Sequence, residues 1–242
     1  MRNGRRKRWM VVLALPVLMA CQPPAPAPQR VVQPPAPAPA CVPQTPEIDG
    51  QAVDRMRAAI LGLLAPQPGL RVGDVGVGGG WFAQRVAERV GNTGAVFGTD
   101  IDAATLTALR QAPPLGPQAA PLRYTLAVGE AQSGLEDLPD NSLDLLMLID
   151  SLCFDQRLPQ PTHVAYLRGL LRVLKPGGRL VHHMDCTCRT RVAQVEALFQ
   201  TAGFTLPPAR TELPCATLAA AACPDGEAQE RARFVGVFGI AR

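Results

Sequence analysis

The chain has 242 residues and a formal charge of +4, from 24 lysines and arginines against 20 aspartates and glutamates. Five basic residues and no acidic ones fall within residues 1–20, so the rest of the chain carries 24 − 5 = 19 basic against 20 acidic side chains, a net charge of −1. This distribution excludes a lysine- and arginine-rich phosphate-binding surface, and we expect no nucleic-acid partner. The length excludes a disulfide mini-protein and suits one domain with appendages.

Residues 1–20 have the pattern of a signal peptide. Basic residues precede a twelve-residue apolar run at 9–20, which is shorter than the about 20 residues that a membrane-spanning helix needs. The run ends in LMAC at 18–21, a string that resembles the bacterial lipobox, in which the cysteine is lipidated. We therefore expect Cys21 to anchor the protein to a membrane. An ordinary secretory signal and a twin-arginine signal at Arg5 and Arg6 remain alternatives.

Residues 21–46 form a proline-rich linker after the expected lipidated cysteine. Ten of the 25 prolines fall within residues 22–46, interleaved with alanine. Such a sequence cannot bury a core and favours extended polyproline II structure, which acts as a semi-rigid spacer. By resemblance to known lipoproteins, Gln22 favours delivery to the outer membrane. We expect a lipid-anchored envelope protein, with its domain at 47–242 on the periplasmic side.

From residue 47 onward, strand patterns alternate with helical patterns. Helices are expected at 48–64, 80–90, 103–110, 161–174 and 190–202. Strands are expected near 71–76, 95–99, 122–128, 143–149, 179–184, 205–212 and 233–240. Strands separated by helices favour an α/β fold with a doubly wound, mostly parallel seven-stranded sheet. No long helix precedes the last strand, so we expect that strand to be antiparallel.

A glycine-rich turn follows the first expected strand. The segment VGDVGVGGG at 72–80 places Asp74 ahead of Gly76, Gly78 and Gly80. Glycine permits a tight turn and close approach of a ligand, and ligands of parallel sheets bind beyond the carboxyl ends of the strands. The spacing differs from the G-x-G-x-x-G dinucleotide pattern. A tight turn without a ligand is the alternative.

Acidic residues end the second expected strand, in GTDID at 98–102. A carboxylate at this place can accept hydrogen bonds from the ribose hydroxyls of an adenosine group, and we expect Asp100 to do so. Asp102 precedes the next helix and is expected to be its N-cap. The segment LKPGG at 174–178 is a helix stop and turn, so its expected role is structural.

Four segments occur in the order and spacing of a known family: DVGVGGGWFAQRVA, VFGTDID, LPDNSLDLLMLID and LRVLKPGGRLV. Together they resemble class I S-adenosylmethionine-dependent methyltransferases, over residues 50–242. The resemblance implies a Rossmann-like fold with S-adenosylmethionine as the cofactor. It implies that the glycine turn surrounds the methionine part of the cofactor. It further implies that Asp100 holds the ribose, that Ile101 packs on the adenine and that Glu130 contacts the adenine edge.

The region after the fourth strand carries less information about the acceptor. Residues 151–156 lack an Asn/Asp-Pro-Pro-Tyr motif, which within this family disfavours amide nitrogens and adenine bases as acceptors. We expect a small-molecule methyl acceptor. Methyl transfer mainly needs alignment of the reactants, and a base is needed where the acceptor must lose a proton.

Several residues are candidates for such a base. Asp150 ends the fourth strand, and His182 and His183 end the fifth, where they must point to opposite faces. These three are the expected catalytic residues. Asp155 and His163 are further candidates, although His163 lies near a helix start and is expected to be exposed.

Six cysteines follow Cys21. In an exported protein an even set suggests disulfides, and among the 15 pairings that of Cys215 with Cys223 is a reasonable first choice. The alternative is a soft-metal or metalloid site in HHMDCTC at 182–188. The sequence contains no Cys-x-x-Cys pair, so we expect no metal.

The leading hypothesis is a lipid-anchored methyltransferase with an unidentified acceptor. S-adenosylmethionine is made in the cytoplasm, whereas the signal directs export. The alternatives are therefore a non-catalytic envelope protein that retains the fold, and a Cys/His protein that binds a soft metal or metalloid.

Overall fold

The computed structural model describes residues 50–113, 115–129, 132–152, 154, 158–183, 192–206, 211–212 and 234–240. The expected signal peptide and linker lie outside these residues, as do Glu130, Asp155 and all seven cysteines. No helix within the described ranges is long and apolar enough to cross a membrane.

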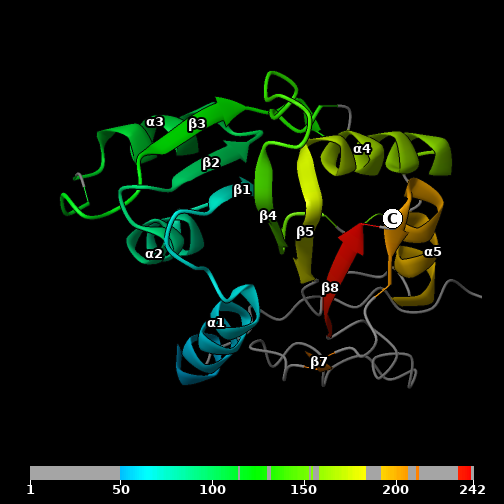
Figure 1. Cartoon of the computed structure of the whole chain (residues 1–242), viewed down its shortest axis with the longest axis horizontal. Coiled ribbons are helices and arrows are strands. Elements are labelled where there is room, and N and C mark those ends of the chain that lie inside the picture. The colour runs from blue at the N-terminus through cyan, green and yellow to red at the C-terminus, as the bar shows by residue number, and fades with distance from the viewer. Residues whose placement is uncertain are drawn as a thin grey trace, which may run out of the picture. The chain divides into compact units, whose positions relative to one another are not determined.

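Helices and strands alternate from α1 to β3 and again from β4 to β6 (Figure 1). The helices are α1 (Gly50–Leu64), α2 (Trp81–Val90), α3 (Ala103–Gln111), α4 (Gln160–Val173) and α5 (Val192–Ala202). The strands are β1 (Arg71–Val75), β2 (Ala95–Asp100), β3 (Leu122–Leu126), β4 (Leu143–Ile149), β5 (Leu174–His183), β6 (Phe204–Thr205), β7 (Thr211–Glu212) and β8 (Phe234–Ile240).

The strands form one sheet in the order β3-β2-β1-β4-β5-β8-β6, and β7 also pairs with β8. Strands β1 to β5 are parallel, which confirms a doubly wound α/β fold. Strand β8 runs antiparallel to β5. The described sheet has eight strands rather than the expected seven, because the two-residue strands β6 and β7 pair separately with β8. Strand order reverses between β1 and β4, where ligands of such sheets bind.

Apolar side chains cover both faces of the sheet. Along β4, Leu146 and Leu148 join the cluster under α4 and α5, whereas Leu145 and Met147 join the cluster under α1 and α2. Successive residues of a strand point to opposite faces, so a central strand covered on both sides must be apolar throughout. The uninterrupted apolar run at 145–149, which follows Asp144, is therefore the sequence signal of the central position of β4.

Strand β5 begins at Leu174, five residues earlier than the sequence pattern predicts. The segment 174–178 continues directly from α4 and pairs with β4 through a register shift between Leu143 and Leu145. The Lys175 Nζ atom lies 2.8 Å from the Asp144 Oδ1 atom and holds this irregular segment against β4. The expected turn is thus part of the strand.

The packing of β4 predicts the effect of Leu148→Ala. Leu148 is fully buried, and a cavity at such a site lowers the free energy of unfolding by about 2–5 kcal/mol. Leu158→Ala is the control, because Leu158 is 36% exposed and its loss should cost about 1 kcal/mol or less. Urea denaturation followed by circular dichroism measures both. Equal losses would contradict this account of the core.

Candidate functional site

Hydrogen bonds to the end of β2 hold the glycine-rich turn between β1 and α2. The backbone N–H groups of Gly76 and Val77 both donate to the carbonyl of Thr99, each at 2.8 Å. The N–H of Gly78 donates to the Asp100 Oδ2 atom at 2.9 Å. The glycine-rich turn and the acidic end of β2 are therefore joined by hydrogen bonds at the carboxyl edge of the sheet.

The three glycines of the turn have different surroundings. Gly76, Gly78 and Gly80 have φ values of 78°, 48° and 78°, in the left-handed region that favours glycine. A Cβ atom on Gly76 would clash with Ser151, and one on Gly80 would lie 2.6 Å from a methyl carbon of Leu109. A Cβ atom on Gly78, or on the adjacent Gly79, would meet nothing within 4 Å. The turn therefore borders open space at Gly78 and Gly79.

The Asp100 carboxylate is fixed at the end of β2. Its Oδ2 atom accepts from Gly78, and its Oδ1 atom accepts from the backbone N–H of Asp102 at 3.0 Å. Each carboxylate oxygen has a second acceptor position, so Asp100 can still accept from ribose hydroxyls. The expected N-cap is confirmed, because the Asp102 carboxylate accepts from the N–H groups of Ala104 and Thr105.

Three large apolar side chains remain exposed beside Asp100. Ile101 is 68% exposed, Leu126 50% and Val128 59%, and Leu126 is the register partner of Asp100. Exposed apolar groups gathered in one place mark a binding surface, and a nucleobase has a matching apolar face. Ile101 was predicted from the sequence, whereas Leu126 and Val128 were not. Glu130, expected in this region, lies outside the described residues.

Asp74 is a buried carboxylate beneath the turn. Its side chain is on β1, the residue is 3% exposed, and its Oδ2 atom has no hydrogen-bond partner. Burial, and to a lesser extent the charge of Asp100, raise the pKa of Asp74 to about 7. A buried carboxylate without a partner is costly, and a cationic ligand group would remove that cost. These residues therefore fit a ligand that joins a nucleoside to a positively charged group.

Two expected catalytic residues meet at the ends of β4 and β5. The His183 Nδ1 atom and the Asp150 Oδ1 atom are 2.6 Å apart, and the N–H of Asp150 donates to the carbonyl of His183 at 3.1 Å. The structure thus brings Asp150 and His183 together as a hydrogen-bonded pair.

The third expected catalytic residue lies elsewhere. His182 is fully buried, and its ring lies 5.5 Å from those of Phe154 and Phe199, by ring centroids. Its Nε2 atom is 3.2 Å from the carbonyl oxygen of Leu152. Burial lowers the pKa of His182 to about 4, so the ring is neutral. His182 therefore packs in the core beneath α5 and does not join the Asp150–His183 pair.

The expectation that His163 is exposed is wrong. His163 lies in the first half of α4, is buried, and packs edge-on against Phe154 with a centroid distance of 5.6 Å. It belongs to the same aromatic cluster as His182. Burial here follows from the packing of α4 on the sheet, which the position of a residue along a helix does not reveal.

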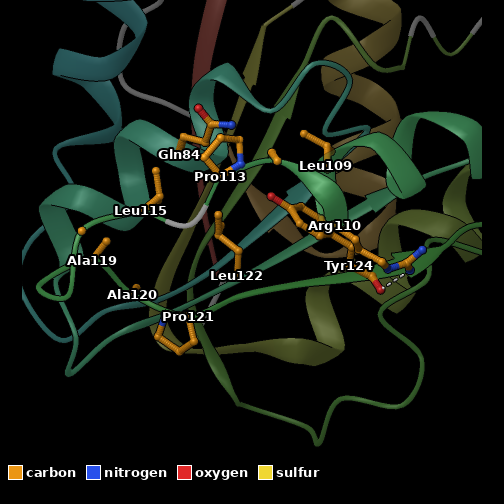
Figure 2. A pocket seen from close by; sticks show the side chains of 12 residues that line it. Gln84, Leu109, Arg110, Pro113, Leu115, Ala119, Ala120, Pro121, Leu122 and Tyr124 are labelled. Atoms are coloured by element: carbon orange, nitrogen blue, oxygen red, sulfur yellow. Dashed lines mark hydrogen bonds between the residues drawn. The ribbon is translucent and has the colours of Figure 1, made fainter.

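A separate cavity of about 410 Å³ lies between α2, α3 and β3. Figure 2 shows Arg110 reaching Tyr124, to whose carbonyl it donates at 2.8 Å. Tyr124 packs over Gly98, where a Cβ atom would lie 2.8 Å from its ring, and Leu109 packs against Gly80. The cavity therefore adjoins the glycine turn from behind, but none of the expected site residues lines it.

The structure describes only part of the alternative soft-metal site at 182–188. Asp185, Cys186 and Cys188 of the alternative soft-metal site lie outside the described residues, as do Cys215 and Cys223. Among the residues that are described, no group of three or more histidines, cysteines or acids could hold a metal ion.

Known proteins share this sequence pattern. Residues 72–178 match the family described as Methyltransferase domain. Over 116 residues the chain is 34% identical to the ubiquinone/menaquinone biosynthesis C-methyltransferase UbiE of Laribacter hongkongensis. The match covers 48% of this chain and 43% of that protein, so the chain spans less than half the length of this curated relative.

Solved structures share the fold. An S-adenosylmethionine-dependent methyltransferase from Aquifex aeolicus has a TM-score of 0.53 at 19% identity, covering 75% of this chain and 87% of its own. One from Mesorhizobium loti has a TM-score of 0.55 at 21% identity, covering 80% of this chain and 100% of its own. At these identities the likeness shows the fold.

Asp74→Asn tests the unusual state of the buried carboxyl. The folded-state pKa of about 7 exceeds the reference value of 3.8. The contribution of this carboxyl to the free energy of unfolding is therefore fully present below pH 3.8 and is lost as the pH rises through 7. Relative to the wild type, Asp74→Asn should therefore gain about 2–3 kcal/mol of unfolding free energy between pH 5 and pH 8. Urea denaturation without ligand at both pH values measures this. A difference that does not change with pH would contradict the raised pKa.

Proposed function

We propose that the methyltransferase domain at residues 72–178 makes this chain an S-adenosylmethionine-dependent methyltransferase that acts on a small-molecule acceptor. The observation that carries the proposal is the glycine turn itself, which borders open space at Gly78, follows the buried Asp74 on β1 and donates a hydrogen bond to the Asp100 carboxylate. The family match, the relative named as a C-methyltransferase and the two solved structures named for this cofactor support it.

Different residues of this site would contact different parts of the cofactor. The exposed apolar groups Ile101 and Leu126 offer a surface for the adenine, and Asp100 offers acceptor positions for the ribose hydroxyls. Asp74 supplies negative charge toward the cationic methionine end. When bound, S-adenosylmethionine supplies a methyl group on a positively charged sulfur. The protein then has to orient the acceptor and exclude water, because alignment accounts for much of such a rate acceleration.

A small molecule is the proposed acceptor. The sequence DSLCF at 150–154 follows β4 in place of the Asn/Asp-Pro-Pro-Tyr motif of nitrogen methylation. The relative in Laribacter hongkongensis is named for C-methylation in quinone biosynthesis. Since the shared segment covers the cofactor motifs, the likeness supports the use of the cofactor more strongly than it supports that particular acceptor.

The N-terminal sequence supports a lipid-anchored position in the cell envelope. The string LMAC at 18–21 follows a short apolar run, and Cys21 would carry the lipid. A linker at 21–46 in polyproline II form would reach up to about 80 Å, at about 3.1 Å per residue. It would hold the domain away from the membrane, on the periplasmic side if the protein is delivered to the outer membrane.

Asp100→Ala tests the cofactor site. The carboxylate would make charge-assisted hydrogen bonds to the ribose, so its loss should weaken S-adenosylmethionine binding by about 1.5–3 kcal/mol, or roughly 10- to 150-fold. Isothermal titration calorimetry of the full chain measures the affinity. Asp137→Ala is the matched control, because Asp137 is an exposed carboxylate. Folded wild-type protein that gives no heat with millimolar cofactor would favour a non-catalytic envelope protein, and unchanged affinity in Asp100→Ala would refute the role of Asp100.

Metabolic labelling tests the anchor. Cells that express the full chain and receive radioactive palmitate should incorporate label into the protein, and the variant Cys21→Ser should lose it. The variant Cys41→Ser is the control, because Cys41 lies in the linker beyond the lipobox-like string. Label that persists in Cys21→Ser would overturn lipidation at Cys21.

A further inference from the structure

We propose that the Asp150–His183 pair accepts a proton from the methyl acceptor, which is therefore a compound with a hydroxyl, enol or thiol group. This inference rests on the proposed methyltransferase function and specifies its acceptor class. It goes beyond the cofactor motifs, because those bind the methyl donor and say nothing of what receives the methyl group.

The first support is the position of the pair in the sheet. Residues two apart on a strand face the same side, so His183 shares a face with Val181 and Asp74 shares a face with Val72. Val181 and Val72 belong to the same apolar cluster. His183 and Asp74 therefore point to the same side of the sheet, near the carboxyl ends of β5 and β1. Strand order reverses between β1 and β4, and β5 is the next strand after β4.

The second support is contact with the glycine turn. Ser151 follows Asp150 directly, and it packs so closely on Gly76 that a Cβ atom there would clash with it. Asp150 is therefore one residue away from the turn beneath which the Asp74 carboxylate lies. The pair borders the region proposed for the methionine end of the cofactor, which carries the methyl group.

The backbone of Asp150 gives a third support. Its φ of 53° lies in the left-handed region, which costs a non-glycine residue of the order of 1–3 kcal/mol, although aspartate tolerates it better than most. The N–H of Asp150 donates to the carbonyl of His183, and its carboxylate accepts from the same residue. Both bonds hold this conformation, which turns the carboxylate onto the imidazole.

The hydrogen bond to Asp150 also selects the tautomer of the His183 imidazole. With Nδ1–H donating to Asp150, a neutral ring has its lone pair on Nε2, the atom at the far side of the ring. In the described part of the chain, no hydrogen bond is made to Nε2 of His183. The Asp150 side chain is 38% exposed and that of His183 is 6% exposed. The neighbouring His182 stays neutral and points to the opposite face.

The proton balance of the reaction then follows. The acceptor oxygen or sulfur forms its new bond to the methyl carbon as the carbon–sulfur bond of the donor breaks, and that electron pair stays on the donor sulfur. The O–H or S–H proton goes to Nε2 of His183, and the resulting imidazolium is stabilised by the Asp150 carboxylate, as in other acid–histidine pairs. An enol that is methylated on carbon loses the same proton.

A base at the Asp150–His183 pair would favour hydroxyl acceptors over neutral amines. A neutral amine attacks through a lone pair that it already has, so a base adds little to the transition state. A hydroxyl group is a weak nucleophile until its proton is removed, and a positioned base accelerates such steps by about 100- to 10,000-fold. A hydrogen-bonded Asp–His pair beside the methyl donor therefore favours acceptors with an ionisable proton.

The test uses the full chain and the variants His183→Asn, His183→Ala and Asp150→Asn. Asp137→Asn is the matched control, as an exposed carboxylate outside the site. Calorimetry with S-adenosylmethionine comes first, and each variant should retain an affinity within about threefold of the wild type. Absent binding by the wild type would refute the proposed function itself, whereas retained binding isolates the acceptor step.

Methyl transfer from labelled S-adenosylmethionine is then measured with catechol, 4-nitrophenol and benzylamine as probes. We expect the wild type to methylate catechol, and His183→Asn to lose about 100-fold or more of that rate. The loss should be far smaller with 4-nitrophenol, which is already ionised at mildly alkaline pH. Imidazole in solution should restore part of the catechol activity of His183→Ala. Equal losses on both phenols, a wild type that methylates benzylamine alone, or one that binds cofactor but methylates no probe would overturn the proposal.

A second readout does not depend on activity. The short bond of the pair predicts a downfield proton resonance from Nδ1–H of His183 in the wild type without ligand, absent in His183→Ala and shifted in Asp150→Asn, but unchanged in Asp137→Asn. A spectrum that is the same in Asp150→Asn and the wild type would show that the pair does not form, and would overturn the proposal independently of any acceptor.

Discussion

The site depends on how the turn after β1 is tied to the last residues of β2. Two backbone N–H groups share the carbonyl of Thr99, and a third reaches the side chain of Asp100. These bonds satisfy the backbone of a segment that has no regular structure of its own. They also fix where Gly78 faces open space, where Asp74 lies beneath the turn, and how the Asp100 carboxylate is presented. Every other element of the site is positioned relative to this connection.

The two adjacent histidines of β5 show how a strand separates neighbouring side chains. His182 enters an aromatic cluster with Phe154 and Phe199, where a charge would be costly, and it is held neutral. His183 turns to the other face and meets Asp150. The same residue type therefore serves packing at one position and hydrogen bonding at the carboxyl edge at the next, because successive residues of a strand point in opposite directions.

Features that depend on local spacing could be predicted from the sequence. Asp74, the glycines and Asp100 lie within short segments whose pattern fixes their place at strand ends, and Asp102 is a cap because a helix follows it. Leu126 was missed because its place beside Asp100 depends on the register between β2 and β3. The burial of His163 could not be read from the chain, since it depends on how α4 packs against a loop and a helix distant in sequence.

The buried Asp74 has a thermodynamic consequence for ligand exchange. With a pKa near 7, its carboxyl is largely protonated in mildly acidic solution when the site holds no cation. A cationic ligand that pairs with the carboxylate must displace that proton, so ligand uptake and proton release are linked. Below neutral pH, the apparent affinity for such a ligand then falls by up to about tenfold for each unit of pH. A fall in pH would therefore lower the occupancy of this site without any change in ligand concentration.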